Sequence, residues 1–193
     1  MDTRSQILNL AIRQLKNGGY DELNFRNIAS ELGISRPTIH HHFANKENLA
    51  RVALTEFIED DLGYQKAMIE RYLSDFPKAL NAIDKYFEEL YSAHPGEGIC
   101  ACCPLLLSTS GIPSSLKALT RDYFERLSAV YEAGIRQSQK AGTVRKSVKA
   151  KNLAWECILL MVGMTDVGTT IEAGEFVHHP ARRLFKAKAA EIG

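Results

Sequence analysis

Residues 36–42, with the sequence RPTIHHH, bring hydrogen-bonding and titratable side chains close together. Ile39 and Phe43 are four positions apart, so on a helix both would lie on one face and turn toward a core. The other faces would then carry the polar side chains of the stretch: Arg36, Thr38, His40, His41 and His42. Guanidinium, hydroxyl and imidazole groups donate hydrogen bonds to base edges and phosphates. The pattern therefore predicts a surface that contacts nucleic acid.

Three of the four cysteines lie close together, at Cys100, Cys102 and Cys103. A thiol with a lowered pKa reacts with oxidants and electrophiles, and a position near the start of a helix favours the thiolate. These cysteines are therefore candidate sensors of a thiol-reactive signal. The alternative is that they are small, buried packing residues, which is the usual role of free cysteine.

The sequence carries neither a metal-binding nor a catalytic motif. C-x-C-C lacks a second cysteine pair at zinc-finger spacing, and three consecutive histidines on a helix point in different directions and cannot converge on one ion. There is no G-x-S-x-G, no phosphate-binding glycine loop and no H-E-x-x-H. We predict no metal site, no cofactor and no enzymatic activity.

Apolar residues also recur at helical spacing in the segment just before the polar stretch. Asn24 can cap this first short helix, and Gly33 can end it in the left-handed conformation. Ser35 or Arg36 can cap the next helix, with Pro37 in its first turn. Two short helices joined by a glycine turn form a helix-turn-helix, whose second helix can enter the major groove of DNA.

A third helical pattern covers residues 5–17, and the glycine pair at positions 18 and 19 ends it. Its apolar stripe would pack on the two short helices and complete a three-helix head. Arg26 would lie at the start of the second helix, within reach of the DNA backbone. Asn45 can cap a further helix and would place Lys46 in the first turn, where a helix N-terminus attracts anions.

From about residue 4 to residue 52 the chain resembles the DNA-binding segment of TetR-family transcriptional regulators. The resemblance is carried by the amphipathic first helix and by FRNIASELGISRPTIHHHFANKENL, in which the helix starts, the turn and the following lysine all align. It implies that Lys46 contacts phosphate in double-stranded operator DNA. Many members carry tyrosine at the position of His40, where the hydroxyl meets a phosphate, and an imidazole can donate to the same acceptor.

The composition is that of an ordinary globular protein, with 193 residues, 45% of them hydrophobic and 24% charged. The formal net charge is only +1, so the prediction of DNA binding rests on the motif and not on bulk charge. The start MDTRSQIL has no apolar signal region, and the longest apolar run is far shorter than the roughly 20 residues of a membrane span. The crowded cysteines do not form a disulfide framework. We expect a soluble, cytoplasmic protein without a membrane partner.

Helical patterns continue along the chain without strand-like alternation, so we predict an all-α fold. We assign residues 1–48 to a helix-turn-helix DNA-binding domain and residues 49–193 to a helical bundle that binds an effector and dimerises. Residues 150–172 are apolar on more than one face. Together with a last helix at about residues 179–192, they are expected to form a homodimer interface. The alternative is that residues 150–172 form a central core helix.

Aromatic and methionine side chains of the second domain would suit an apolar pocket between helices. Tyr123 and Trp155 are candidate contacts for a small apolar or electrophilic effector, and the pocket itself is implied by the resemblance. The predicted function is a transcriptional regulator, a repressor in most such proteins, that leaves a palindromic operator in response to an effector or a thiol-reactive signal. The alternative function is a thiol- or ligand-handling sensor or enzyme with a vestigial DNA-binding head.

Overall fold

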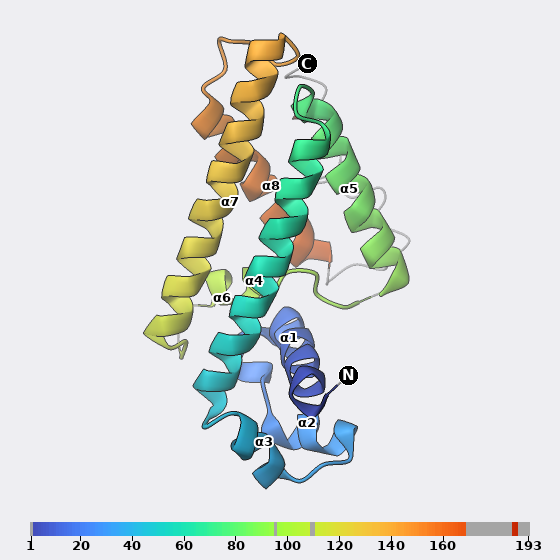
Figure 1. The fold of residues 1–193 in the computed structure, drawn as a ribbon, viewed down its shortest axis with the longest axis vertical. Helices are drawn as coiled ribbons and strands as arrows, with labels where there is room; N and C mark the ends of the chain where they lie inside the picture. The colour runs from blue at the N-terminus through green and yellow to red at the C-terminus, as the bar shows by residue number, and fades with distance from the viewer. Residues whose placement is uncertain (1, 95, 109–110, 169–186, 189–193) are drawn as a thin grey trace. The chain divides into compact units, whose positions relative to one another are not determined.

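The computed structural model describes residues 2–94, 96–108, 111–168 and 187–188, and within them every regular element is an α-helix (Figure 1). The helices are α1 (Thr3–Glu22), α2 (Phe25–Leu32), α3 (Arg36–His42), α4 (Lys46–Arg71), α5 (Phe76–Ala93), α6 (Cys103–Leu107), α7 (Ser114–Ala141) and α8 (Ala150–Gly168). The predicted all-α fold is confirmed.

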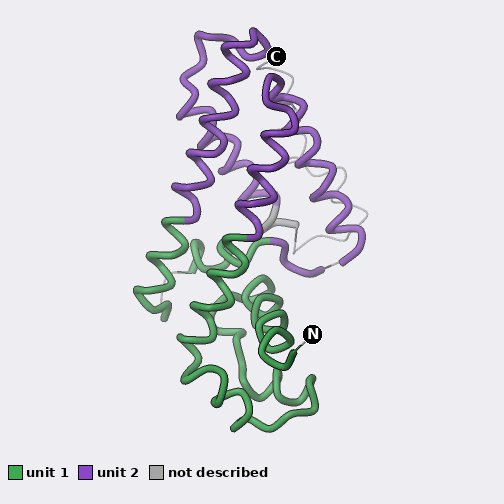
Figure 2. Tube along the Cα trace, viewed as in Figure 1, with its two compact units in different colours: residues 1–59, 100–122 green, residues 60–99, 123–193 purple. Residues whose placement is uncertain are grey.

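The chain divides into two compact units (Figure 2). Unit 1 comprises Met1–Glu59 and Cys100–Asp122, and unit 2 comprises Asp60–Ile99 and Tyr123–Gly193. The helices α4 and α7 each contribute residues to both units. The helix-turn-helix residues lie in unit 1, and a domain division between residues 48 and 49 stays a prediction.

Side-chain caps set the limits of the short helices in unit 1. The Asn24 side chain accepts a hydrogen bond from the backbone N–H of Arg26, at 2.8 Å, where α2 begins. Gly33 ends α2 in the left-handed conformation, with a φ of 64°. Ser35, and not Arg36, caps α3 by accepting from the N–H of Thr38. The predicted helix-turn-helix is therefore confirmed, including its glycine turn.

The glycine pair interrupts α1 but does not end it. Gly18 and Gly19 are non-helical, and Gly19 has a φ of 67° and a ψ of −152°. These angles are accessible in practice only to glycine. One further helical turn follows as far as Glu22, so the prediction that the helix stops at the glycines was too short by that turn.

Unit 1 has its own apolar core, built by the amphipathic stripes of the first three helices. The fully or almost fully buried side chains that these helices and the residue after α3 contribute include Ile7, Leu8, Ala11, Leu15, Ile28, Ile39 and Phe43. The short helix α6 packs against α1 in the same unit. It begins only at Cys103 because Pro104 lies in its first turn, where a proline starts a helix well but cannot sit inside one.

Unit 2 is built by α5, α8 and parts of α4 and α7. Gly63 does not interrupt α4, which runs on to Arg71. Tyr131 is 0% exposed. Its hydroxyl donates to Oε1 of Gln65 at 2.9 Å and lies 3.2 Å from Sδ of Met161. This satisfies the one polar atom of a large buried side chain.

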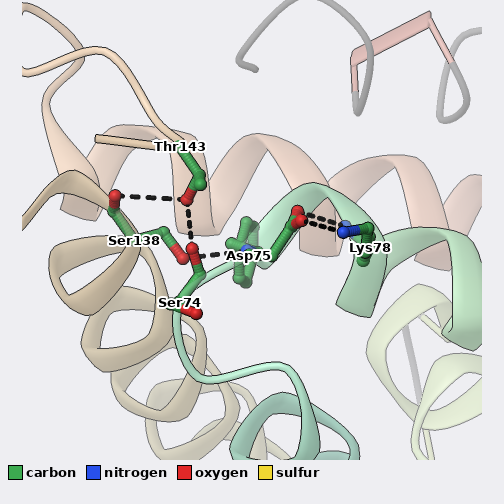
Figure 3. Close-up of polar contacts among 6 residues, drawn as sticks. Ser74, Asp75, Lys78, Ser138 and Thr143 are labelled. Atoms are coloured by element: carbon green, nitrogen blue, oxygen red, sulfur yellow. Dashed lines mark hydrogen bonds and ion pairs between the residues drawn. The ribbon is translucent and has the colours of Figure 1, made fainter. Parts of the chain in front are cut away.

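Hydrogen bonds join the start of α5 to the end of α7 (Figure 3). The N–H of Phe76 donates to Oγ of Ser138 at 2.8 Å, and the hydroxyl of Thr143 donates to the carbonyl oxygen of Ser74. Asp75 caps α5 by accepting from the N–H of Lys78 at 3.1 Å. The Lys78 side chain also donates to this carboxylate and is the main cause that lowers the pKa of Asp75.

We expect Gly134→Ala to destabilise the protein. The new Cβ would lie 2.5 Å from Cγ2 of Ile69 and 3.2 Å from Cδ2 of Phe76. Overpacking of this kind costs about 1–3 kcal/mol. That cost exceeds the roughly 0.5–1 kcal/mol that alanine gains over glycine in a helix. Urea unfolding followed by circular dichroism measures the difference.

Gly63→Ala is the matched control, because no atom lies within 4 Å of the Cβ it would add. We expect this variant to be more stable than the wild type by about 0.5–1 kcal/mol. If both variants gained the same stability, Gly134 would not lie as close to Ile69 of α4 as the structure places it.

Candidate nucleic-acid interface

The polar surface predicted from the sequence lies on α3, and two buried apolar side chains orient it. Ile39 is 0% exposed and Phe43 is 1% exposed, so their common face of the helix turns into the core. The predicted contact residues of α3 that are exposed are Arg36, Pro37, His40 and His41. Their arrangement agrees with the face assignment made from the spacing.

Thr38 differs from these four residues because it takes part in the helix cap. It is half-buried, and its hydroxyl oxygen lies 2.9 Å from Oγ of Ser35, the residue that caps α3. A hydroxyl has one donor and two acceptor positions, so Thr38 keeps capacity for two further contacts. Its position is more strongly constrained than that of the exposed side chains.

A hollow of about 430 Å³ lies between the start of α2 and the exposed side of α3. The residues that line it are Asn24, Phe25, Arg26, Arg36 and His40. Two guanidinium groups, which are always charged, and an imidazole therefore face one space. This combination of donors suits a phosphate or another anion. The structure thus brings together three of the predicted contact residues: Arg26, Arg36 and His40.

The ring of Phe25 packs beside His40. The two ring centroids are 5.0 Å apart and the planes are inclined by 58°. Phe25 therefore holds the imidazole at the edge of the hollow, a role that was not predicted from the sequence. The helical pattern placed Phe25 on an apolar stripe, and nothing in that pattern indicates a partner on the next helix.

Lys46 begins α4, outside the set of residues that line the hollow. Asn45 accepts a hydrogen bond from the N–H of Asn48 at 2.8 Å, so the predicted cap is confirmed. The ammonium group of Lys46 lies 4.6 Å from the centroid of the Tyr20 ring and donates to the carbonyl oxygen of Asp21 at 3.4 Å. An ammonium group has three donors, so further hydrogen bonds are available for a phosphate. The last turn of α1 therefore positions this lysine.

The clustered cysteines all lie in unit 1 and are buried. Cys103 is the first residue of α6, and Cys100 precedes this helix by three residues. Hydrogen bonds from the thiols of Cys102 and Cys103 hold the pKa of Cys100 well below its usual range, although burial acts in the opposite direction. The cluster and its place near the start of a helix were evident from the sequence, but the hydrogen bonds among its thiols were not.

The candidate effector contacts Tyr123 and Trp155 lie in unit 2 and not with the cysteines. Tyr123 is 4% exposed, and its hydroxyl donates to Oδ2 of Asp61 at 2.8 Å. Trp155 is half-buried on α8. The two groups of candidate effector and redox residues thus belong to separate units.

Among the residues that the structure describes, no group of three or more histidine, cysteine, aspartate or glutamate side chains is placed to hold a metal ion. No helix in the described part of the chain has both the length and the apolar character needed to cross a membrane.

Comparison with known proteins agrees with this geometry. The sequence profile described as "Bacterial regulatory proteins, tetR family" matches residues 7–53. The nicotine-responsive transcriptional repressor HdnoR of Paenarthrobacter nicotinovorans is 34% identical over 59 residues. That match covers 31% of this chain and 30% of HdnoR, so the chain is aligned with less than a third of this curated relative.

Solved structures are similar over almost the whole chain. A TetR-family transcriptional regulator from Agrobacterium tumefaciens has a TM-score of 0.83 at 22% identity and covers 95% of this chain and 96% of its own. A cysteine-substituted variant of the TetR-family regulator CifR, complexed with 26-base-pair operator DNA, has a TM-score of 0.77 at 14% identity. It covers 99% of this chain and 95% of its own. At these identities the likeness concerns the fold.

Proposed function

We propose that this chain, which is a TetR-family transcriptional regulator, represses transcription. In this proposal it binds a palindromic operator as a homodimer in the cytoplasm. The family consists of DNA-binding regulators and not of enzymes, which argues against an enzyme with a vestigial head. Repression is supported by the name of the relative that matches the head, which is a transcriptional repressor.

The positive hollow between α2 and α3 is the main support for the proposed DNA contact. It lies where the second helix of a helix-turn-helix begins, and the N-terminal residues of that helix contact base edges in the major groove. In the proposed complex Arg26 and Lys46, each at the start of a helix, bind phosphates. The residues that contact the groove are Arg36, Thr38, His40 and His41, while Pro37 shapes the first turn of α3.

The proposed dimer places two copies of α3 on half-sites about one helical turn of DNA apart. Its support within the described residues is α8, on which Leu159 is 64% exposed while Cys157 and Ile158 are buried. A leucine exposed to this degree on the most apolar helix suits burial against a second copy of the chain. The last helix predicted for the interface, at about residues 179–192, lies outside the described residues.

Release from the operator requires a signal that favours a second conformation. Inverting a population from 1:99 to 99:1 requires a preference of about 5.5 kcal/mol for that conformation. The proposed signal is a small apolar or electrophilic effector that reaches the aromatic side chains of unit 2, such as Tyr123 and Trp155, or a reagent that modifies a cysteine of unit 1.

We expect Arg36→Ala and Lys46→Ala to weaken DNA binding in different ways. A lost base contact costs about 1–3 kcal/mol at one position of the site, so Arg36→Ala should relax sequence preference. A lost phosphate contact should weaken all sequences alike and reduce the slope of log affinity against log salt by about 1. Fluorescence anisotropy measures both effects, with a duplex selected from a random pool and a scrambled duplex.

Lys85→Ala is the matched control, because it removes a positive charge from the exposed side of α5 in unit 2. Its affinity and salt slope should equal those of the wild type. If all three variants changed binding equally, the effect would be one of net charge, and the assigned contacts would be wrong.

A second prediction concerns the dimer. Leu159→Arg should convert the dimer to a monomer in sedimentation analysis, because a charge buried at an interface is strongly unfavourable. Leu73→Arg is the control, since Leu73 is 52% exposed but lies in the turn after α4. A Leu159→Arg variant that remained dimeric would exclude this face of α8 from the interface.

A further inference from the structure

Cys100 and Cys103 have the spacing C-x-x-C, which in redox proteins joins a thiol of lowered pKa to a second thiol that can resolve its oxidised form. Cys102 lies between them. Cys100 is the most accessible of the three, at 9% exposed, while Cys102 is 0% and Cys103 is 4% exposed. A small oxidant would therefore meet Cys100 first.

The surroundings of Cys100 favour its thiolate. The thiols of Cys102 and Cys103 donate to its sulfur, and the backbone N–H groups of the same two residues add to the effect. Cys157 in unit 2 shows the opposite case, since burial raises the pKa of its thiol to about 12. Because the thiolate is the reactive form, these two cysteines should differ sharply in reactivity.

The cysteine segment also contacts the glycine kink of α1, within the same unit. A Cβ added at Gly19 would lie 3.3 Å from Cβ of Pro104 and 3.7 Å from its carbonyl carbon. Gly19 is buried and has a positive φ. The absence of a side chain there thus allows both the kink and the close approach of α6.

The residues that follow the kink in α1 contact Lys46, at the N-terminal end of α4. The residues after Gly19 are Tyr20 and Asp21, and these are the two residues that Lys46 contacts through the aromatic ring and the carbonyl oxygen. Cys103 and Lys46 are thus connected by a short series of packed residues: Pro104, Gly19, Tyr20 and Asp21.

We propose that Cys100 is a peroxide-reactive thiol that forms a disulfide with Cys103, and that this bond disturbs the contact of α6 with Gly19 and weakens the hold of Lys46 on DNA. The effect on DNA rests on the function proposed above, whereas the thiol chemistry does not.

The chemistry balances without a further reactant. The Cys100 thiolate attacks one oxygen of hydrogen peroxide, the S–O bond forms, the O–O bond breaks and the hydroxide that leaves is protonated to water. The Cys103 thiolate then attacks the sulfur of the sulfenic acid, the S–S bond forms and a second water leaves. Two thiols are oxidised and one hydrogen peroxide is reduced to two waters.

The new bond requires movement of the chain. Sulfur atoms in a disulfide are about 2.05 Å apart, much closer than two thiols that share a hydrogen bond. Cys103 is the first residue of α6 and precedes Pro104, so drawing it toward Cys100 also moves the proline that packs on Gly19. Loss of the thiolate also removes the acceptor that the surrounding donors share.

Mass spectrometry of the reduced full-length protein, treated with hydrogen peroxide and then alkylated, tests the chemistry. The wild type, Cys102→Ser and Cys157→Ser should each lose two alkylatable thiols and show a peptide that links residues 100 and 103. Cys100→Ser should lose none, and Cys103→Ser should stop at a sulfenic acid that dimedone traps. Oxidation of Cys157, retention of all thiols in the wild type, or disulfide formation in Cys100→Ser would overturn the assignment.

Binding to a duplex selected by the reduced wild type tests the link to DNA. Oxidation should lower affinity by about tenfold or more, within the roughly 5- to 150-fold range of common allosteric couplings, and dithiothreitol should restore it. Cys100→Ser should bind in the same way before and after peroxide. If the disulfide forms while affinity stays unchanged, the proposed route through α6 is wrong.

The Pro104→Ala variant tests whether disulfide formation lowers DNA affinity through Pro104. This variant should still form the disulfide, but its affinity for the selected duplex should then change by less than about threefold, which is below the usual range of allosteric couplings. A response equal to that of the wild type would remove Pro104 from the route. If the reduced wild type selected no duplex at all, the proposed function would fail, and the mass measurements would still decide the thiol assignment.

Discussion

The position of the exposed polar side chains of α3 depends on the burial of Ile39 and Phe43 in the core of unit 1. Full burial of such side chains is worth about 1.5–3 kcal/mol each. Because the two residues are four positions apart, their burial also sets the rotation of α3 about its axis. Arg36 and His40 are four positions apart as well, so they face the hollow together. A rotation by one residue, about 100°, would turn both away.

The local features of this site could be predicted from the sequence because they depend on residues two to four positions apart. Asn24, Ser35 and Asn45 cap their helices through hydrogen bonds to an N–H two or three residues later. Gly33 adopts the left-handed angles that its place between two helical patterns requires. Such signals lie within a single helical turn, so they can be recognised without knowledge of the tertiary structure.

The remaining features of the site are contacts between residues that lie far apart in the sequence. The spacing of apolar residues within one helix does not relate such residues to each other. His40 packs on Phe25, fifteen positions earlier, and Lys46 contacts Tyr20 and Asp21 on a different helix. The pKa of Cys100 is lowered mainly by hydrogen bonds from two neighbouring thiols. A pattern of apolar spacing predicts which face is buried, but it does not determine which polar atoms meet.

The contacts that hold Lys46 matter for the proposed complex because this chain has a net charge of only +1. In that complex, binding would depend on a small number of local phosphate contacts, so each contact would be a large share of the total. A side chain held in place before binding avoids an ordering cost of about 0.5–1.5 kcal/mol, which corresponds to about a two- to twelvefold gain in affinity. In the proposed dimer two such lysines would together raise the affinity for DNA by about 5- to 150-fold. In the proposed dimer, losing the contacts of both lysines with the last turn of α1 would therefore account for a roughly tenfold loss of DNA affinity without rearrangement of the recognition helix itself.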